Sequence, residues 1–262
     1  MFELYGCYFY YAGFDSEAYD LVFANVETSR IVSLEAARNV NTIRSKRNHT
    51  HLITSITYED APISFEAEIV TSDGSPLPDE IVPYVERELF SRTEYGELFN
   101  ISEYGKSQVY INCVLTNPEK IESEAGIIGF KCVVTTDSSM AWEETTTVTP
   151  TMSGSSSKTF SVDVDTDMPG YTYPKVTFTI GSSGGDVTLY NNTDDATRFT
   201  SFTGLAPNST FVMDSRINYI SGNQYARFSD RNFIRLKDGT NNFFLTGDVT
   251  SITFEFNNRK YI

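Results

Sequence analysis

Apolar and polar residues alternate strictly over residues 252–256, where Ile, Phe and Phe are separated by Thr and Glu. A period of two residues is typical of a β-strand that buries one face. Asp-Gly at 238–239 and Gly-Asp at 247–248 supply residues that tolerate positive φ, as turns between strands require. We therefore expect residues 232–262 to form three short strands joined by two turns, at the closing edge of a β-sandwich.

Strand-like segments recur through most of the chain, and turn residues separate them. Residues 63–69 are the clearest case in the first half, because Ile, Phe, Ala and Ile alternate with Ser64, Glu66 and Glu68. The 19 Phe and 16 Tyr residues also favour strands over helices. Further segments of this kind are 8–11, 21–26, 52–58, 108–115, 126–134, 160–164, 175–180, 187–191, 198–202, 210–214 and 217–220.

One segment, from about residue 79 to about residue 90, is predicted to be helical. Ile81, Val85 and Leu89 form an apolar stripe with the i, i+4, i+8 spacing of one helix face. Asp and Glu at 79–80 suit the first turn, beside the positive end of the helix dipole, and Pro83 lies early enough to be tolerated. The chain is therefore expected to be mostly β with one helix.

The alternation weakens between Ser29 and His51, where basic residues gather instead. We interpret this segment as a long hairpin or arm that projects from the sheet. Because the rest of the first half is acidic, local positive charge here favours a contact between subunits. The candidate interface residues are Arg38, Arg44, Lys46 and Arg47, and Arg30 lies in the same segment.

The distribution of charge and of small polar residues predicts two domains. The formal net charge is −15; residues 1–150 carry 10 Lys and Arg against 24 Asp and Glu, whereas residues 151–262 carry 10 against 11. Residues 135–158 are rich in Ser, Thr and Gly, a composition typical of a linker. We expect domains at 1–148 and 149–262, with the boundary between 140 and 160.

The charge, the hydrophobic runs and the cysteine spacing argue against several classes of protein. Acidic charge argues against nucleic-acid binding, because phosphate contacts need a basic surface. No apolar run approaches membrane-spanning length, and the first residues lack the basic leader of a signal peptide. Cys7, Cys113 and Cys132 show no C-x-x-C spacing, so we expect buried, inert thiols rather than disulfides or a zinc site. The sequence predicts a soluble protein made in the cytosol.

No arrangement typical of catalysis or metal binding stands out. His49 and His51 form an H-x-H pair without a third ligand, so a solvated or subunit-contacting arm is the better interpretation. Residues 155–158 satisfy S-x-x-K but lie in the Ser/Gly-rich segment rather than on a helix. The alternating Asp residues of 163–167 lack the glycine and glutamate of a calcium loop and indicate a polar strand face. We predict no catalytic, cofactor-binding or metal-binding residue, and no enzyme activity.

Several short motifs occur in a fixed order over both halves of the chain. They are Phe14-Asp15 with Asp20-Leu21-Val22, Pro62 to Glu66, Phe130-Lys131-Cys132 with Ser138, Ala141 and Trp142, Tyr173-Pro174, and a C-terminal set of Phe233, Leu236, Gly239, Asn241 or Asn242, Gly247 and the run to Tyr261. No single motif is specific. Their order and spacing resemble the distal tail protein family of long-tailed, non-contractile bacteriophages, over almost the whole chain.

The resemblance implies an N-terminal β-sandwich with one helix and a projecting arm, followed by a C-terminal galectin-like β-sandwich. It also implies a structural virion protein that forms a ring, typically a hexamer, at the distal end of the phage tail. The implied partners are other copies of the chain, the major tail tube protein, the tail hub or tail-associated protein and a receptor-binding protein. Neither a cofactor nor a nucleic acid or membrane partner is implied.

A carbohydrate-binding module that recognises host cell-wall sugars is the main alternative, because exposed aromatic rings beside polar groups can hold a sugar. The single tryptophan, Trp142, falls before the second domain. Tyr190, Tyr219 and Tyr225 could replace it, although packing in a core or an interface is the commoner role of such residues. A secreted lectin-type adhesin is a third possibility, and an enzyme fits the sequence least well.

Overall fold

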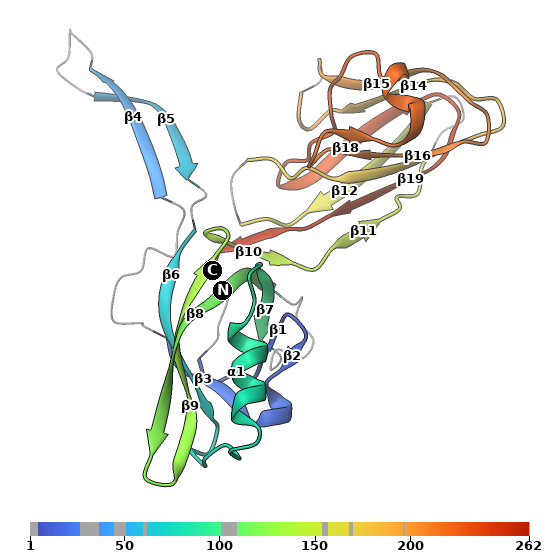
Figure 1. The fold of residues 1–262 in the computed structure, drawn as a ribbon. Helices are drawn as coiled ribbons and strands as arrows, with labels where there is room; N and C mark the ends of the chain where they lie inside the picture. Colours follow the sequence, from blue (N-terminus) through green and yellow to red (C-terminus); the bar gives the residue numbers. More distant parts are fainter. Residues whose placement is uncertain are drawn as a thin grey trace. The chain divides into compact units, whose positions relative to one another are not determined.

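The computed structural model describes residues 5–26, 37–44, 51–59, 62–100, 109–153, 157–167, 170–195 and 197–261 (Figure 1). The chain divides into two compact units, one formed by residues 1–142 with 260–262 and the other by residues 143–259. Strands dominate both units, and the described residues contain one α-helix, α1. The predicted mostly β class with a single helix is confirmed.

The first unit is built around an antiparallel sheet with the strand order β2-β1-β7-β8-β9-β6-β3. Strand β10 pairs with β8 and with β20, so the last strand of the chain lies in this unit. The predicted alternation is confirmed in β6, where Phe65, Ala67 and Ile69 are buried. The strands are β1 (Phe9–Tyr11), β2 (Phe14–Asp15), β3 (Leu21–Val26), β6 (Ser64–Thr71), β7 (Gly96–Asn100), β8 (Val109–Ser123), β9 (Gly126–Thr136), β10 (Met140–Glu143) and β20 (Arg259–Tyr261), with a short 3-10 helix at Glu17–Tyr19.

The two ends of this sheet meet, so the sheet encloses its own core. The segment that leads into β1 bridges to β3 at Tyr8 and Val22, and the Gly6 amide donates to the Phe23 carbonyl at 2.7 Å. Inside the sheet, the rings of Phe9 and Phe23 pack with their centroids 4.5 Å apart. The N-terminal sandwich is therefore made by one curled sheet rather than by two separate ones.

Helix α1 (Val82–Phe90) begins three residues later than the sequence suggested. A turn precedes it, in which the Pro78 carbonyl accepts a hydrogen bond from the Ile81 amide at 2.8 Å. Pro83 then occupies the first turn of the helix, where its missing amide hydrogen costs nothing. Val85 and Leu89 are fully buried in the same core as the sheet, which confirms the predicted stripe.

The hairpin of β8 and β9 is longer than predicted. The sequence suggested a connection over residues 116–125, but β8 continues to Ser123 and pairs with β9 as far as Gly126. A bulge near Asn117, whose φ is 53°, interrupts the register. The distal part has exposed side chains on both faces, so the apolar alternation that marks a half-buried strand is missing there.

The described residues of the predicted arm form a two-stranded ribbon. β4 (Ala37–Arg44) pairs antiparallel with β5 (His51–Glu59), and neither pairs with any other strand in the described part of the chain. The strand predicted over residues 52–58 is the second strand of this hairpin. The sequence pattern predicted the strand but not its pairing partner.

The second unit is a β-sandwich of two antiparallel sheets, with the orders β11-β19-β13-β16-β17 and β12-β18-β14-β15. Residues from both sheets share one core, in which Phe178 and Phe211 stack 5.0 Å apart. The strands are β11 (Thr146–Val148), β12 (Ser157–Val164), β13 (Lys175–Ile180), β14 (Gly185–Asn191), β15 (Phe199–Leu205), β16 (Thr210–Asp214), β17 (Tyr219–Ile220), β18 (Gly239–Thr246) and β19 (Val249–Phe256), with a short 3-10 helix at Gly222–Arg227.

The C-terminal strands are not the closing edge that the sequence suggested. β18 lies between β12 and β14, and β19 lies between β11 and β13, so both are central strands of different sheets. The turn at Gly247 therefore crosses from one sheet to the other; its φ is 103°, and a Cβ there would lie 2.3 Å from the Asp186 carbonyl oxygen. The first predicted strand of this set makes only an isolated bridge, between Leu236 and Thr172.

The predicted linker is ordered structure in its first part. Thr136, Ser138 and Ala141 are buried, and the Thr136 hydroxyl donates to the Ser138 carbonyl at 2.5 Å. Strand β10 follows, and the division between the two compact units falls after Trp142. Small polar residues in this stretch satisfy buried backbone groups at the edge of the core, a role that composition alone does not distinguish from that of a linker.

Candidate assembly surfaces

The structure describes the backbone of two of the four predicted interface residues. Arg38 and Arg44 lie on β4, opposite Tyr58 and His51 of β5. The other two, Lys46 and Arg47, lie outside the described residues, as do Arg30 and His49. The interface role of all four stays a prediction.

The outer face of β6, β9 and β8 is acidic. Glu68, Lys131 and Glu119 lie opposite one another in one row across the three strands, and Glu66 and Val133 lie in the next row. The Lys131 ammonium lies 2.8 Å from the Glu66 carboxylate, and this hydrogen bond raises the pKa of Lys131. We call these five residues the acidic face. Its carboxylates outnumber its cation, so it can attract a basic partner.

A row of three aromatic residues crosses the outer face of β1, β7 and β8. Tyr10 lies opposite Phe99, and Phe99 lies opposite Tyr110. All three are half-buried, whereas the flanking Phe9 and Tyr11 are fully buried in the core. The Tyr10 and Phe99 rings stack with centroids 4.9 Å apart. Outward aromatic residues on a sheet are suited to contact with another surface.

Sequence reasoning found only part of these two surfaces. The outward positions of Glu66 and Glu68 follow from the alternation in residues 63–69. Glu119 and the aromatic row were missed, because each depends on which strands pair and in which register. A polar and apolar pattern gives the face of a residue but not its neighbour across the sheet.

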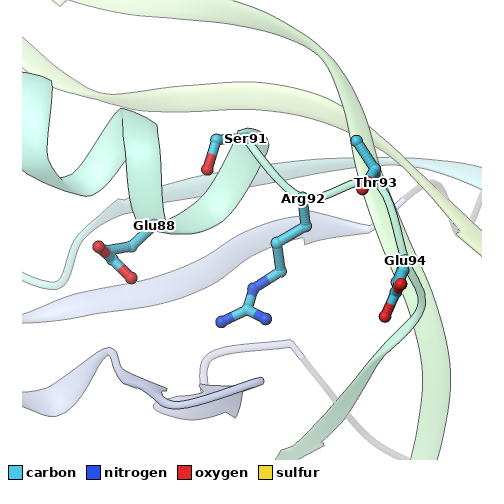
Figure 2. A pocket seen from close by; sticks show the side chains of 5 residues that line it. All are labelled: Glu88, Ser91, Arg92, Thr93 and Glu94. Carbon is cyan, nitrogen blue, oxygen red and sulfur yellow. The ribbon is translucent and has the colours of Figure 1, made fainter.

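A polar pocket of about 340 Å³ lies beside the C-terminal end of α1. Figure 2 shows the Arg92 side chain between those of Glu88 and Glu94, with Ser91 and Thr93 completing the lining. The Arg92 guanidinium donates to the Ala12 carbonyl and lies 5.7 Å from the centre of the Tyr11 ring. These contacts tie the loop after the helix to the turn between β1 and β2, so Arg92 has a structural role.

The cysteines behave as predicted in the core. Cys113 and Cys132 are completely buried and not disulfide-bonded. Burial raises the pKa of the Cys132 thiol to about 12 and raises that of Cys113 still further. A thiol held protonated in this way is a poor nucleophile. Cys7 is half-buried and also free.

The other chemical candidates have structural environments. The Asp residues of 163–167 are exposed and alternate with buried residues along and just beyond β12, and Asp163 accepts a hydrogen bond from Thr240 at 2.7 Å. Lys158 of the S-x-x-K segment lies on β12, and its ammonium donates to the Val249 carbonyl. Ser155 lies outside the described residues. Among the described residues there is no cluster of three metal-binding side chains, and no described helix is long and apolar enough to cross a membrane.

A buried ionic centre fixes the irregular segment before β18 in the second unit. The Asp194 side chain is only 2% exposed, and its carboxylate lies 2.7 Å from Arg235 and 3.7 Å from Arg198. The Arg235 guanidinium also lies 4.0 Å from the centre of the Tyr171 ring. Nearby, Lys237 donates to the Asp194 carbonyl at 2.9 Å. This arrangement holds the segment that sequence analysis expected to be a strand.

The tyrosines proposed for sugar stacking differ in environment. Tyr190 packs against Phe199 and Phe244, at centroid distances of 5.4 and 6.1 Å. Tyr219 and Tyr225 are about half exposed, at 51% and 48%. Trp142 is half-buried on β10, at the end of the first unit.

The fold and these surfaces define a structural β protein with two units and several outward faces suited to assembly. The chain belongs to a family of phage tail proteins, because residues 4–138 match the family model described as phage tail protein N-terminal domain and residues 140–256 match the one described as phage tail C-terminal domain. The protein is therefore a bacteriophage tail component of the virion. A search of curated protein sequences gave no significant match.

Solved structures show the same fold in other phages. The crystal structure of the Dit (gp 19.1) protein of phage SPP1, described as a paradigm of the hub adsorption apparatus in phages that infect Gram-positive hosts, matches with a TM-score of 0.65 and 11% identity, over 96% of this chain and 98% of that chain. The phage P2 baseplate in its activated conformation matches with calcium (TM-score 0.51, 9% identity, 94% and 92% covered) and with strontium (0.50, 11%, 93% and 92%). At these identities the likeness concerns the fold.

Proposed function

We propose that this chain is the distal tail protein of its phage, a ring at the tip of the tail that joins the tail tube to the hub and receptor-binding apparatus. The observation that carries the proposal is the fold shared with the SPP1 Dit protein over nearly the full length of both chains. In this role the ring is a hexamer. Its partners are the major tail tube protein, the tail hub or tail-associated protein and a receptor-binding protein.

The two halves have different tasks in this proposal. Residues 1–148 form the ring, and residues 149–262 contact the surrounding components without catalysis. The first half is the acidic one, with 24 Asp and Glu against 10 Lys and Arg in residues 1–150. A basic arm on such a body favours a head-to-tail contact between copies, which closes a ring when the rotation between copies is a whole fraction of a turn. The chain is made in the host cytoplasm and then enters the virion.

Reversing the charge of the arm tests this ring contact. We expect Arg38→Glu with Arg44→Glu to reduce ring formation in the full-length protein, because two attractive contacts with an acidic neighbour become repulsive. Adding Lys46→Glu and Arg47→Glu should strengthen the effect. Native mass spectrometry measures the assembled fraction, and circular dichroism shows whether the subunit is still folded.

A matched control changes the same amount of charge elsewhere. Arg87→Glu with Arg231→Glu alters two exposed arginines, one in each half of the chain, and should leave assembly unchanged. Raising the salt concentration should weaken the wild-type ring, because exposed charge pairs are screened. If the arm variant assembles as well as the control does, the four basic residues are merely solvated.

A further inference from the structure

Three aromatic residues form a continuous row on the outer face of the sheet β12-β18-β14-β15 in the second unit (Figure 1). Tyr190 of β14 lies opposite Phe199 of β15 on one side and opposite Phe244 of β18 on the other. The centres of these two rings lie 5.4 and 6.1 Å from that of Tyr190. Phe199 is 37% exposed, and the other two residues are half-buried. An aromatic row on the solvent side of a sheet marks a surface suited to binding.

The row is separate from the core of the sandwich. Leu189, Thr200 and Phe243 follow or precede the three rings along their strands, so they point to the opposite side of the sheet, and all three are buried. Neighbouring strands lie about 4.8 Å apart, so the row extends roughly 10 Å across three strands. This length suits an extended ligand better than a single small molecule.

Uncharged polar residues lie on both sides of the aromatic row. On one side, hydroxyl side chains form a parallel row across all four strands, and on the other side Asn242 lies opposite Ser161. Thr159 continues the aromatic row itself, because it lies opposite Phe244. We call these residues together the neutral face: Phe199, Tyr190, Phe244, Thr159, Ser157, Thr246, Thr188, Ser201, Ser161 and Asn242.

The neutral face contains no charged residue, although residues 151–262 hold 10 Lys and Arg and 11 Asp and Glu. Asp163 lies one row beyond it, and its carboxylate accepts a hydrogen bond from the Thr240 hydroxyl at 2.7 Å. Charged ligands are selected by groups of opposite charge, and protein interfaces usually contain arginine and a charged rim. The face therefore favours an uncharged ligand that has apolar surfaces for the rings and many hydroxyl groups for the polar rows.

We propose that the neutral face binds an uncharged polysaccharide of the host cell surface. The apolar faces of successive sugars lie on Phe199, Tyr190 and Phe244, and their hydroxyl groups exchange hydrogen bonds with Thr188 and Asn242 on either side. As a tail component of the virion, the chain belongs to the part of the phage that meets the host. The inference goes beyond the proposed ring and does not depend on it, because one folded chain is enough to bind.

A glycan array tests the proposal with the full-length chain as the probe. The array carries uncharged and acidic polysaccharides, including those isolated from the surface of the bacterium that the phage infects. We expect binding to at least one uncharged polysaccharide, and we expect high salt to leave this binding unchanged, because salt screens only charged contacts. Binding to acidic polysaccharides alone, or to none on the array, would overturn the proposal.

Substitutions at Phe199 locate the binding surface. Phe199→Ala should weaken polysaccharide binding about tenfold, because a stacking ring is lost. Phe199→Tyr keeps the ring and should retain binding. Tyr219→Ala is the matched control, because Tyr219 is a 51% exposed aromatic residue of the same unit but lies on β17 of the other sheet. Circular dichroism shows whether each variant is folded, and equal binding by Phe199→Ala and Tyr219→Ala would place the sugar elsewhere.

Co-purification with the receptor-binding protein of the same phage distinguishes a protein ligand. If Phe199→Ala loses that protein but binds polysaccharide as wild type does, the neutral face is a protein-docking surface and the proposal is wrong. The ring is tested separately. A monomeric chain whose polysaccharide binding depends on Phe199 would support this inference while the proposed ring fails, and a ring that binds no polysaccharide would do the reverse.

Discussion

Phe254 packs between the two sheets of the second unit. It is fully buried on the central strand β19, and its ring lies 5.2 Å from that of Phe243 and 6.0 Å from that of Phe160, so it joins the two sheets. We expect Phe254→Ala to lower the free energy of unfolding by about 3–5 kcal/mol, because the cavity cannot fully collapse. Denaturant unfolding of the full-length protein measures this.

Ser251→Ala is the matched control for that substitution. Ser251 lies on the same strand at a half-exposed position, so its replacement should change the free energy of unfolding by no more than about 0.5 kcal/mol. Equal effects of the two substitutions would mean that Phe254 does not pack as described.

Asp214 should make stability depend on pH. The Arg216 side chain donates to its carboxylate at 2.9 and 2.7 Å, and this hydrogen bonding holds the pKa of Asp214 below its usual range. A carboxylate with a lowered folded-state pKa stabilises the protein above the unfolded-state pKa of about 3.9, and the stabilisation is lost as pH falls through the lower folded value.

The variant Asp214→Asn isolates this contribution. The free energy of unfolding of wild type should fall more steeply than that of the variant as the pH is lowered below about 4. Urea titrations of both proteins at a series of acidic pH values provide the comparison. Parallel curves for the two proteins would show that the Arg216 contact contributes nothing.

At the level of elements, alternation was a reliable guide wherever a strand buries one face on a core. β6, β13 and β19 follow the predicted pattern almost residue by residue. The same signal fails in the distal part of β8, which is exposed on both faces, and in residues 232–236, which are held by a buried ionic centre rather than by a sheet. A hydrophobic pattern indicates which residues are buried in a core. The distal part of β8 is ordered by strand pairing instead, and residues 232–236 are held by ionic contacts.

Pairing was the part of the fold that the sequence could not supply. Residues 52–58 were predicted to be a strand without a named partner, and they pair with β4. The C-terminal strands were predicted to form a closing edge, but β18 and β19 are central strands of two different sheets. Predicting the candidate surfaces from the sequence was limited in the same way, because a surface that spans several strands depends on their pairing. Arg38 and Arg44 could be chosen from charge alone, whereas the acidic face requires the register of three strands.

For the whole molecule, the path of the chain determines which fragments contain a complete first unit. The chain leaves the first unit after Trp142, builds the second unit and returns, so that residues 260–262 belong to the first unit again. Strand β20 then pairs with β10. A fragment that stops near residue 148 lacks this strand, so assembly is best measured on the full-length chain.

In the proposed function, this phage tail protein forms a closed ring. Native mass spectrometry of the full-length wild-type chain, at low salt and over a range of protein concentrations, measures it most directly. We expect a discrete species with six times the mass of one chain, and no series of oligomers that keeps growing with concentration. A strictly monomeric protein at the highest concentration, or an open series of oligomers, would contradict it.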